Sequence, residues 1–361
     1  MEFKTYNGKP DIKRLLRAFK GEEVDRVPNF EVLIENNHVE KILGKKAGNT
    51  LASVGNPAQG IADPLEVIPM DPVDYMEICN KIGQDTTFIE AIWTPFRKED
   101  SSGKLILVSD RSIKNTKDFH KLVMPSEKDM EPTLRHIRNY KEALKGTNIG
   151  VSVLFGTLLT TLYEFVVGMN DFMIACYEDV SFIEEMLEVS TNYWVSFCEA
   201  VINEGVDFIW PADDVAFKTG LFVPPKLFRR LWIPRMSRII EPALEKGIPV
   251  LFHSDGKIDD IVEDLIEMGI DCLNPMDPYS IDYGEYKKRY GSKLSLFGNM
   301  DIEFPLSKGT PQDIDRDVRE HMQILKPGYG YVAASSHSIV DYIPHENFIT
   351  MINAIHKYGK Y

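Results

Sequence analysis

The chain has 361 residues, of which 43% are hydrophobic and 27% charged, and its formal net charge is -14 at pH 7. This composition is typical of a folded globular protein with one large or two modest domains, and it excludes disordered, fibrous and collagenous proteins. The negative charge disfavours binding to nucleic acids and to anionic membranes, because both repel an acidic protein.

The sequence shows no apolar run near the roughly 20 residues of a membrane span, and no apolar stretch typical of a signal peptide at its start. Its four cysteines, Cys79, Cys176, Cys198 and Cys272, have no CxxC spacing and are too few for a disulfide scaffold. We therefore expect a cytoplasmic protein with reduced, mostly buried thiols.

Short β-branched or aromatic runs alternate with longer helical patterns along the chain. After an N-terminal helical segment, the candidate strands are residues 27–33, 86–93, 149–155, 206–212, 248–254, 271–276, 293–299 and 329–335. The helical patterns cover residues 129–146, 171–204, 225–246, 257–268, 311–325 and 345–358. Residues 40–80 and 96–128 are interpreted as insertions.

The junctions between these elements support the alternation. A G-x-D step begins at Gly83, Gly205 and Gly269, where a glycine in the left-handed region can end a helix and return the chain to the sheet. Thr310 and Pro311 form an N-cap and first-turn pair ahead of residues 311–325. Local turn chemistry and hydrophobic period thus predict the same elements.

About eight βα units with apolar strands predict a parallel sheet covered by helices. The fold class that fits best is α/β, a (β/α)8 TIM barrel with an N-terminal helical extension and insertions, spanning residues 1–361 as a single domain. A doubly wound sheet is the alternative. That fold usually shows a glycine-rich phosphate loop after its first strand, and VPNFEVLIENNH contains none.

In such a barrel the functional side chains lie at the carboxyl ends of the strands. Polar residues gather at those ends: Glu31, Glu35, Glu90, Asp213, Asp214, His253, Asp255, Asn274, Asp277, Asn299, Asp301 and His337. Residues of these types also cap helices or face water, so the whole set indicates a site more strongly than any one member does.

The most informative motif is Phe252-His253-Ser254-Asp255-Gly256. A histidine and an acid two residues apart on an extended chain point to the same side, so both can reach one metal ion. The alternative is structural, with Asp255 holding the imidazole or capping the next helix. His337 follows the last strand, and closure of a barrel brings it across the mouth toward His253.

Several blocks resemble the uroporphyrinogen decarboxylase superfamily. They are DDVAFKTGLFVPPKLFRRLWIPRMSRII, KGIPVLFHSDGKIDDIVEDLIEMGIDCLNPMDP, LFGNMDIEFPLSKGTPQDIDRDVREH and GYVAASSHSI followed by PHEN. The resemblance runs nearly end to end and implies a (β/α)8 barrel. The superfamily contains decarboxylases and corrinoid-dependent, usually zinc-dependent, methyltransferases.

The resemblance favours the methyltransferase branch. Its decarboxylases carry an arginine-rich RQAGR motif after the first strand, whereas residues 31–37 here read EVLIENN. Acids in this place would repel a polycarboxylate substrate. Its thiol methyltransferases carry H-x-C and a second cysteine, where this chain has Asp255 and His337. The pattern therefore looks more like enzymes that demethylate methoxylated aromatics or other small donors.

The resemblance implies a zinc ion, for which His253 and Asp255 are the first-choice ligands and His337 is the third, with Asp214 or Glu31 as substitutes. Asp213 and Glu90 are the catalytic candidates, to orient substrate or donate a proton. The substrate-binding candidates are Trp93, Phe155, Trp210 and Glu31.

The implied methyl acceptor is the cobalt of a corrinoid (cobalamin). The sequence shows no D-x-H-x-x-G segment, so this corrinoid is expected on a separate partner protein. A small-molecule methyl donor completes the reaction. Decarboxylation and methanol- or methylamine-linked methyl transfer stay open as alternatives, and a homodimer is among the oligomeric states left open.

Overall fold

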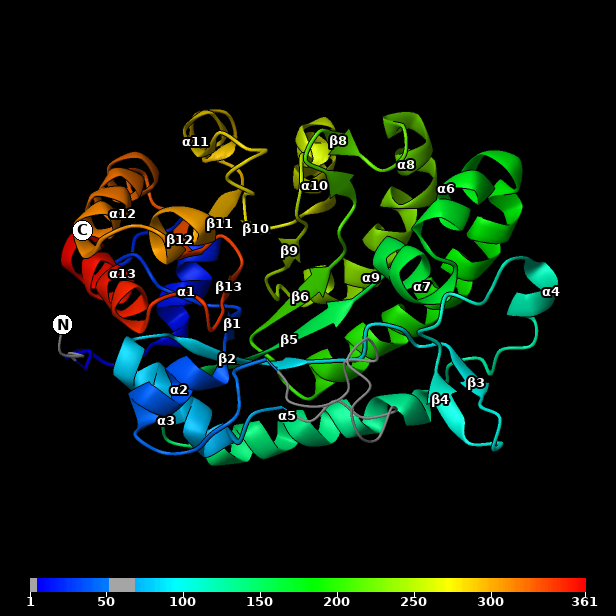
Figure 1. Ribbon diagram of the computed structural model, residues 1–361, viewed down its shortest axis with the longest axis horizontal. Helices are drawn as coiled ribbons and strands as arrows, with labels where there is room; N and C mark the ends of the chain where they lie inside the picture. Colours follow the sequence, from blue (N-terminus) through cyan, green and yellow to red (C-terminus); the bar gives the residue numbers. More distant parts are fainter. Residues whose placement is uncertain (1–4, 52–68) are drawn as a thin grey trace.

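The computed structural model describes residues 5–51 and 69–361. Seven parallel strands form a curled sheet in the order β12-β11-β10-β9-β6-β5-β2, with helices around its outside (Figure 1). The strands are β2 (Thr86–Glu90), β5 (Gly150–Gly156), β6 (Phe208–Ala212), β9 (Leu251–His253), β10 (Cys272–Asn274), β11 (Ser295–Met300) and β12 (Tyr331–Ser335). Each overlaps one of the strands expected from the sequence.

The segment predicted as the first strand closes the barrel. Asn29 forms parallel bridges with Gln84 on one side and with Ala333 on the other. The N–H of Phe30 donates to the Ala333 carbonyl at 3.1 Å, and the N–H of Ala333 donates to the Pro28 carbonyl at 2.9 Å. These bonds join the two edges of the sheet, so the predicted TIM-barrel fold is confirmed and the doubly wound alternative is excluded.

The helices of the described chain follow the predicted alternation. They are α1 (Ile12–Phe19), α2 (Asn36–Leu43), α3 (Pro72–Ile82), α4 (Thr116–Phe119), α5 (Glu131–Ala143), α6 (Met169–Glu178), α7 (Val180–Asn203), α8 (Pro225–Leu231), α9 (Ile233–Glu245), α10 (Val262–Met268), α11 (Tyr283–Tyr290), α12 (Pro311–Leu325) and α13 (His345–Tyr358). Short helical turns are η2 (Glu127–Met130), η3 (Thr161–Val166), η4 (Asp259–Ile261) and η5 (Ile302–Ser307). Within the described residues, no helix has both the length and the apolar character of a membrane span.

Two predicted long helices are each divided in two. Asp179 has a non-helical backbone between α6 and α7, and its side chain accepts a hydrogen bond from the N–H of Phe182 as the N-cap of α7. Pro234 lies in the first turn of α9 and lacks the N–H that would continue α8. The predicted helix at 257–268 begins later, at Val262, after the turn η4.

Among the described residues, three pairs of short strands lie outside the seven-stranded sheet. β3 (Arg97–Glu99) and β4 (Leu105–Leu107) form a hairpin in the expected insertion 96–128, and β7 (Ala216–Phe217) pairs with β8 (Gly220–Leu221) after β6. β1 (Leu33–Ile34) pairs with β13 (Ser338–Ile339). The other expected insertion, 40–80, contains the end of α2 and most of α3, and its residues 52–68 lie outside the described residues.

The predicted helix ends are confirmed. Gly83, Gly205 and Gly269 have φ of 74°, 78° and 95°, the left-handed region that glycine adopts without a Cβ clash. Thr310 caps α12, and the Asp313 carboxylate accepts a hydrogen bond from the Thr310 N–H in a capping box. All four cysteines are buried and free, as expected.

Aromatic rings fill the inside of the barrel. Phe30 contacts Phe88, Trp210 and Phe297, with ring centroids 5.9, 5.3 and 5.3 Å apart, and all four side chains are fully buried. Phe19 of α1 packs edge-on against Phe208 at 5.1 Å. This packing leaves the polar side chains of the barrel interior at the mouth, where the strands end.

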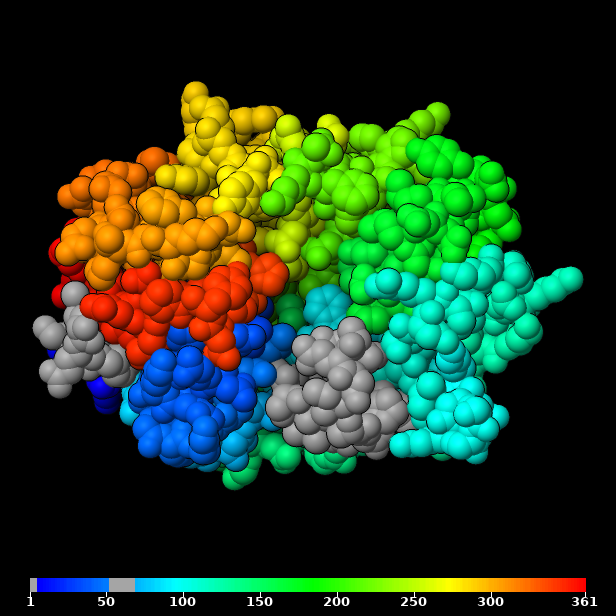
Figure 2. Space-filling model, viewed as in Figure 1, coloured from blue at the N-terminus to red at the C-terminus, as the bar shows by residue number. Residues whose placement is uncertain are grey.

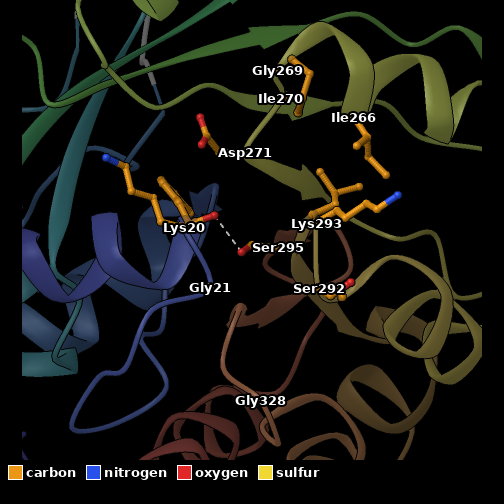
Figure 3. A pocket seen from close by; sticks show the side chains of 13 residues that line it. Lys20, Gly21, Ile266, Gly269, Ile270, Asp271, Ser292, Lys293, Ser295 and Gly328 are labelled. Atoms are coloured by element: carbon orange, nitrogen blue, oxygen red, sulfur yellow. Dashed lines mark hydrogen bonds between the residues drawn. The ribbon is translucent and has the colours of Figure 1, made fainter.

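A cavity of about 530 Å³ lies at the other end of the barrel, beside the starts of β10 and β11 (Figure 3). Lys20 and Lys293 extend to opposite sides of it. Its Ser295 hydroxyl donates to the Ala18 and Phe19 carbonyls, and its Asp271 carboxylate accepts from the N–H of Val250. These polar groups support the connections between elements, so we assign the cavity a structural role.

Candidate functional site

Three side chains with metal-binding atoms meet at the ends of β6 and β9. Ligand atoms of Asp214, His253 and Asp255 all lie within 4.8 Å of one another. Ala212 is the register partner of His253, so the residues just beyond both strands are neighbours. The His253 Nε2 atom lies 3.8 Å from Asp214 Oδ1. One imidazole and two carboxylates therefore face one point.

Backbone hydrogen bonds hold the two acids in place. The N–H of Asp255 donates to Asp214 Oδ1 at 2.8 Å, and the N–H of Asp214 donates to Thr160 Oγ1 at 3.0 Å. Burial raises the pKa of Asp255; the charge of His253 opposes this, and the charge of Asp214 adds to it. A cation between the acids would relieve this repulsion.

The HSDG motif needs its glycine. Gly256 has φ of 85°, and a Cβ there would lie 2.4 Å from the Ala216 carbonyl oxygen. The N–H of Lys257 also donates to the Phe217 carbonyl at 2.9 Å. The turn after β9 can therefore pack directly against the β7–β8 hairpin only with glycine at this position.

A buried amide orients the His253 ring. His253 Nδ1 lies 2.6 Å from Asn274 Oδ1, at the end of the neighbouring strand β10. A carbonyl oxygen only accepts, so Nδ1 carries the proton and Nε2 is left as the free ring nitrogen on the side of Asp214. Metal-binding histidines are commonly held in this way. An amide at the carboxyl end of the adjacent strand is the sequence signal that could have indicated this role.

His337 lies at the rim of the same site. Its Nε2 atom is 3.9 Å from Asp255 Oδ2, its Nδ1 atom is 2.9 Å from Ser338 Oγ, and its side chain is 57% exposed. His253 and His337 thus lie at the same end of the barrel. The third member of the group with His253 and Asp255 is Asp214, whereas the sequence favoured His337. His337 contacts the group only through Asp255.

Figure 2 shows a hollow near the centre of the view, bordered by orange-red and yellow-green parts of the chain. These colours correspond to the segments that follow β12 and to those around β6 and β9. The segments that carry the candidate ligands therefore surround a recess.

Glu90 lies at the end of β2, inside the mouth. Phe88, two residues earlier, points into the barrel, and successive same-face residues on a strand share that direction. The Trp93 indole N–H donates to the Glu90 carboxylate. Burial raises the pKa of Glu90 to about 7, and the Trp93 hydrogen bond opposes the rise. Such a group can hold a proton near neutral pH and release it.

Glu31 connects the first and last strands. Its carboxylate accepts from the Ser335 hydroxyl at 2.6 Å and from the Ser335 N–H at 3.1 Å, and its side chain is fully buried. Burial raises the pKa of Glu31 to about 7, while the bonds from Ser335 oppose the rise. Glu31 is not part of the close group of three, so the structure favours Asp214 over Glu31 as a ligand.

Asp213 has a structural set of contacts. Its carboxylate accepts from the N–H groups of Leu158, Leu159 and Thr160 and from the indole N–H of Trp232, at 2.7 to 3.3 Å. The side chain is fully buried. These donors engage both oxygens, and this set of contacts favours a structural role for Asp213 over the predicted role in orienting substrate or donating a proton. It holds the loop that carries Thr160, the partner of Asp214.

The aromatic candidates separate into three positions. Phe155 stacks on Trp194 of α7 at 5.4 Å, outside the barrel, so it does not line the mouth. Trp210 is fully buried below His253, with ring centroids 6.4 Å apart, and forms part of the floor rather than one wall of a sandwich. Trp93 is half-buried beside Gly156, where a Cβ would lie 2.5 Å from its ring. A place for Trp93 at the mouth, beside Glu90, stays a prediction.

The fold and this arrangement define a class of protein, a (β/α)8 barrel enzyme with a candidate metal centre at the carboxyl ends of its strands. Residues 99–358 match the family described as uroporphyrinogen decarboxylase (URO-D). The chain belongs to this family.

Relatives of the chain have both activities that the superfamily resemblance implied. The chain is 26% identical over 324 residues to a uroporphyrinogen decarboxylase of Methylobacillus flagellatus, covering 86% of each chain. It is also 26% identical over 202 residues to the methylcobamide:CoM methyltransferase MtaA of Methanosarcina barkeri, covering 55% of this chain and 56% of that protein. A methyltransferase structure from Methanosarcina mazei has a TM-score of 0.65 at 18% identity, over 96% of this chain and 98% of that one, and supports the fold.

Proposed function

We propose that the protein is a zinc-dependent methyltransferase that moves a methyl group from a small methoxylated donor, with an aromatic ether favoured, to the cobalt(I) of a separate corrinoid protein. The observation that carries this proposal is the group formed by Asp214, His253 and Asp255. The relationship to a methylcobamide:CoM methyltransferase supports the corrinoid partner.

The residues present fit a zinc ion. Zinc binds imidazole nitrogen and carboxylate oxygen. Here His253 bonds Asn274 through Nδ1, so the other ring nitrogen, Nε2, is left for the metal, and it lies 3.8 Å from Asp214 Oδ1. His253, Asp214 and Asp255 would hold the ion, with His337 beside them. When bound, zinc supplies Lewis acidity toward an oxygen of the donor. A nitrogen and oxygen ligand set suits a hard oxygen atom better than a thiol.

Glu90 supplies the proton that the reaction needs. In methyl ether cleavage the O–CH₃ bond breaks, the methyl group goes to the cobalt(I) nucleophile, and the bonding electron pair stays on the donor oxygen. That oxygen then takes a proton. The protonated Glu90 carboxyl, held by Trp93, is the candidate source, because its pKa of about 7 keeps a large protonated fraction at neutral pH.

The acids of the mouth disfavour the decarboxylase alternative. Glu31 and Glu35 stand where the family's decarboxylases carry arginines, and both engage the last strand or its following loop through Ser335 and the N–H of Asp341. Asp214 and Asp255 add two more carboxylates. A substrate with many carboxylates would meet like charge here, which costs binding free energy.

The test is a direct assay of methyl transfer. The purified, zinc-loaded protein is incubated with a reduced corrinoid and with methoxylated aromatics, methanol or methylamines, and methyl-cobalt(III) absorbance is followed. His253→Ala serves as the inactive control. Methylation from a methoxylated aromatic supports the proposal. Release of CO₂ from uroporphyrinogen, with no methyl transfer from any donor, would show that the protein is a decarboxylase instead.

A further inference from the structure

Asn274 is a buried amide that contacts the candidate metal ligand His253. Its side chain is fully buried, and it lies in register with His253 across β9 and β10. Its Oδ1 atom is 2.6 Å from His253 Nδ1. In the described part of the chain, its Nδ2 atom has no hydrogen-bond partner. The contact with His253 is therefore the hydrogen bond that this side chain contributes to the structure.

The contact selects one tautomer of the imidazole. A neutral imidazole carries one N–H, and the amide oxygen of Asn274 can only accept, so the proton is held on Nδ1. The lone pair is then on Nε2, the nitrogen that lies 3.8 Å from Asp214 Oδ1. The opposite tautomer would place two acceptors, Nδ1 and Oδ1, against each other at 2.6 Å.

A second buried asparagine–histidine pair begins on the neighbouring strand, β11. Asn299, at the end of β11, pairs through Oδ1 with His321 Nε2 at 3.0 Å, and its Nδ2 donates to the Met276 carbonyl. His321 belongs to α12 and its Nδ1 faces the Asp317 carbonyl at 2.8 Å. Both pairs join a buried asparagine to a histidine, but only the Asn274 pair leaves a ring nitrogen directed at the acids of the site.

We propose that Asn274 is a positioning residue that fixes His253 in the Nδ1–H tautomer and so presents Nε2 as a preformed metal ligand. The proposal rests on the proposed function in that it assigns Nε2 to zinc. It also makes a statement about the metal-free protein, because the tautomer is set by Asn274 before any metal binds. Partners of this kind typically contribute 10- to 100-fold to metal affinity.

The experiment reads the tautomer and the zinc affinity separately. Protein labelled with ¹⁵N in histidine is stripped of metal, and long-range ¹H–¹⁵N spectra are recorded for the parent, Asn274→Leu, Asn274→Asp and Asn299→Leu, with His253→Gln to assign the signals. Zinc dissociation constants are measured by competition with a chromophoric chelator. Asn299→Leu is the matched control, because it removes a buried asparagine–histidine contact one strand away.

The expected result is an Nδ1–H signal for His253 in the parent, its loss in Asn274→Leu, and a zinc dissociation constant raised about 10- to 100-fold in that variant. Asn274→Asp, which keeps the acceptor, restores both readouts, and Asn299→Leu behaves like the parent. The proposal is overturned if the parent carries the proton on Nε2, or if Asn274→Leu keeps both the tautomer and the affinity.

The parent spectrum and Asn274→Asp decide the matter even if Asn274→Leu does not fold. Loss of the Nδ1–H signal in Asn274→Asp also counts against the proposal. A parent that shows this signal but transfers no methyl group contradicts the proposed function and not the positioning role.

Discussion

The N–H of Asp255 donates a hydrogen bond to Asp214 Oδ1 at 2.8 Å, so the backbone of one candidate ligand holds the side chain of the other. The two acids come from different loops, after β6 and after β9. Their convergence on His253 concentrates negative charge where a cation would be stabilised.

Removing the imidazole should remove the metal. We expect His253→Ala to lose most bound zinc and most corrinoid methylation, because Nε2 is the nitrogen ligand of the group. His337→Ala should retain more zinc, since His337 is more exposed and contacts only Asp255 among the three. His120→Ala, a change at an exposed histidine paired with Glu185, is the control. Elemental analysis measures the zinc, and equal zinc in all variants would contradict the assignment.

Changing the ligand chemistry should separate metal binding from catalysis. Asp255→Cys introduces a thiolate, a good zinc ligand that makes the ion less electrophilic than a carboxylate does. We expect this variant to bind zinc yet demethylate the best donor much more slowly. Zinc content and the rate of corrinoid methylation are measured together. A rate at or above that of the parent would refute the role of an electrophilic zinc at this motif.

Glu90 should give the activity an alkaline limit. The carboxyl group donates a proton only below its pKa, which burial raises to about 7, so the rate should fall as the pH rises past that value. Glu90→Gln should lower the rate by about 10²- to 10⁴-fold and abolish this alkaline fall in the pH–rate profile. Trp93→Phe removes the hydrogen bond that favours the charged form of Glu90, so in this variant the alkaline fall in rate should move to higher pH. Unchanged pH profiles in both variants would exclude Glu90 as the proton donor.

Glu31 should make the folding stability depend on pH. Its folded pKa of about 7 lies above its ordinary value of 4.5, so the folded state binds the proton more tightly and loses stability as the pH rises from about 4.5 to 7. The change amounts to roughly 3 kcal/mol for a shift of this size. Glu31→Gln keeps an acceptor for Ser335 and should flatten this part of the profile, measured by urea unfolding at several pH values. Glu99→Gln, at an exposed position, should leave the profile unchanged.

Gly256 should tolerate no side chain. Gly256→Ala places a Cβ 2.4 Å from the Ala216 carbonyl oxygen at a φ of 85°, whereas Gly44→Ala has a φ of 72° and nothing within 4 Å. Both variants bear the strain of the left-handed region, about 1 to 2 kcal/mol. Only Gly256→Ala should lose substantially more free energy of unfolding and bind zinc more weakly, because it displaces the turn after His253. Equal losses in the two variants would show that the close approach is unimportant.

The sequence predicted the fold well because local signals agreed with each other. Apolar strands, helical periods and glycine helix ends such as Gly83 all indicate βα units, and α12 and α13 begin and end where their capping and periodicity predict. The breaks near Asp179 and Pro234 were missed, since the helical pattern continues across each of them.

The site was harder to predict, because the strands are apolar on both faces and show no alternation. Without it, the sequence does not tell which of two neighbouring residues faces the mouth. Phe155 faces α7. Asp213 bonds the loop that carries Thr160, whereas its neighbour Asp214 lies beside His253. The role of Asn274 depends on the register of β9 with β10, which is a property of the assembled sheet.

The contacts that join the two edges of the sheet form a seam, and this seam should be among the last parts of the barrel to assemble. The bond between Glu31 and Ser335 joins residues 304 apart in the chain, whereas the bond between Asp255 and Asp214 spans 41. Loop closure over the longer distance costs more entropy, so the seam should form late. The three candidate ligands could thus come together in a partly folded chain, and His337, which follows the last strand, would join them only as the seam closes. Zinc present during refolding should therefore act as an early nucleus and accelerate the recovery of native structure.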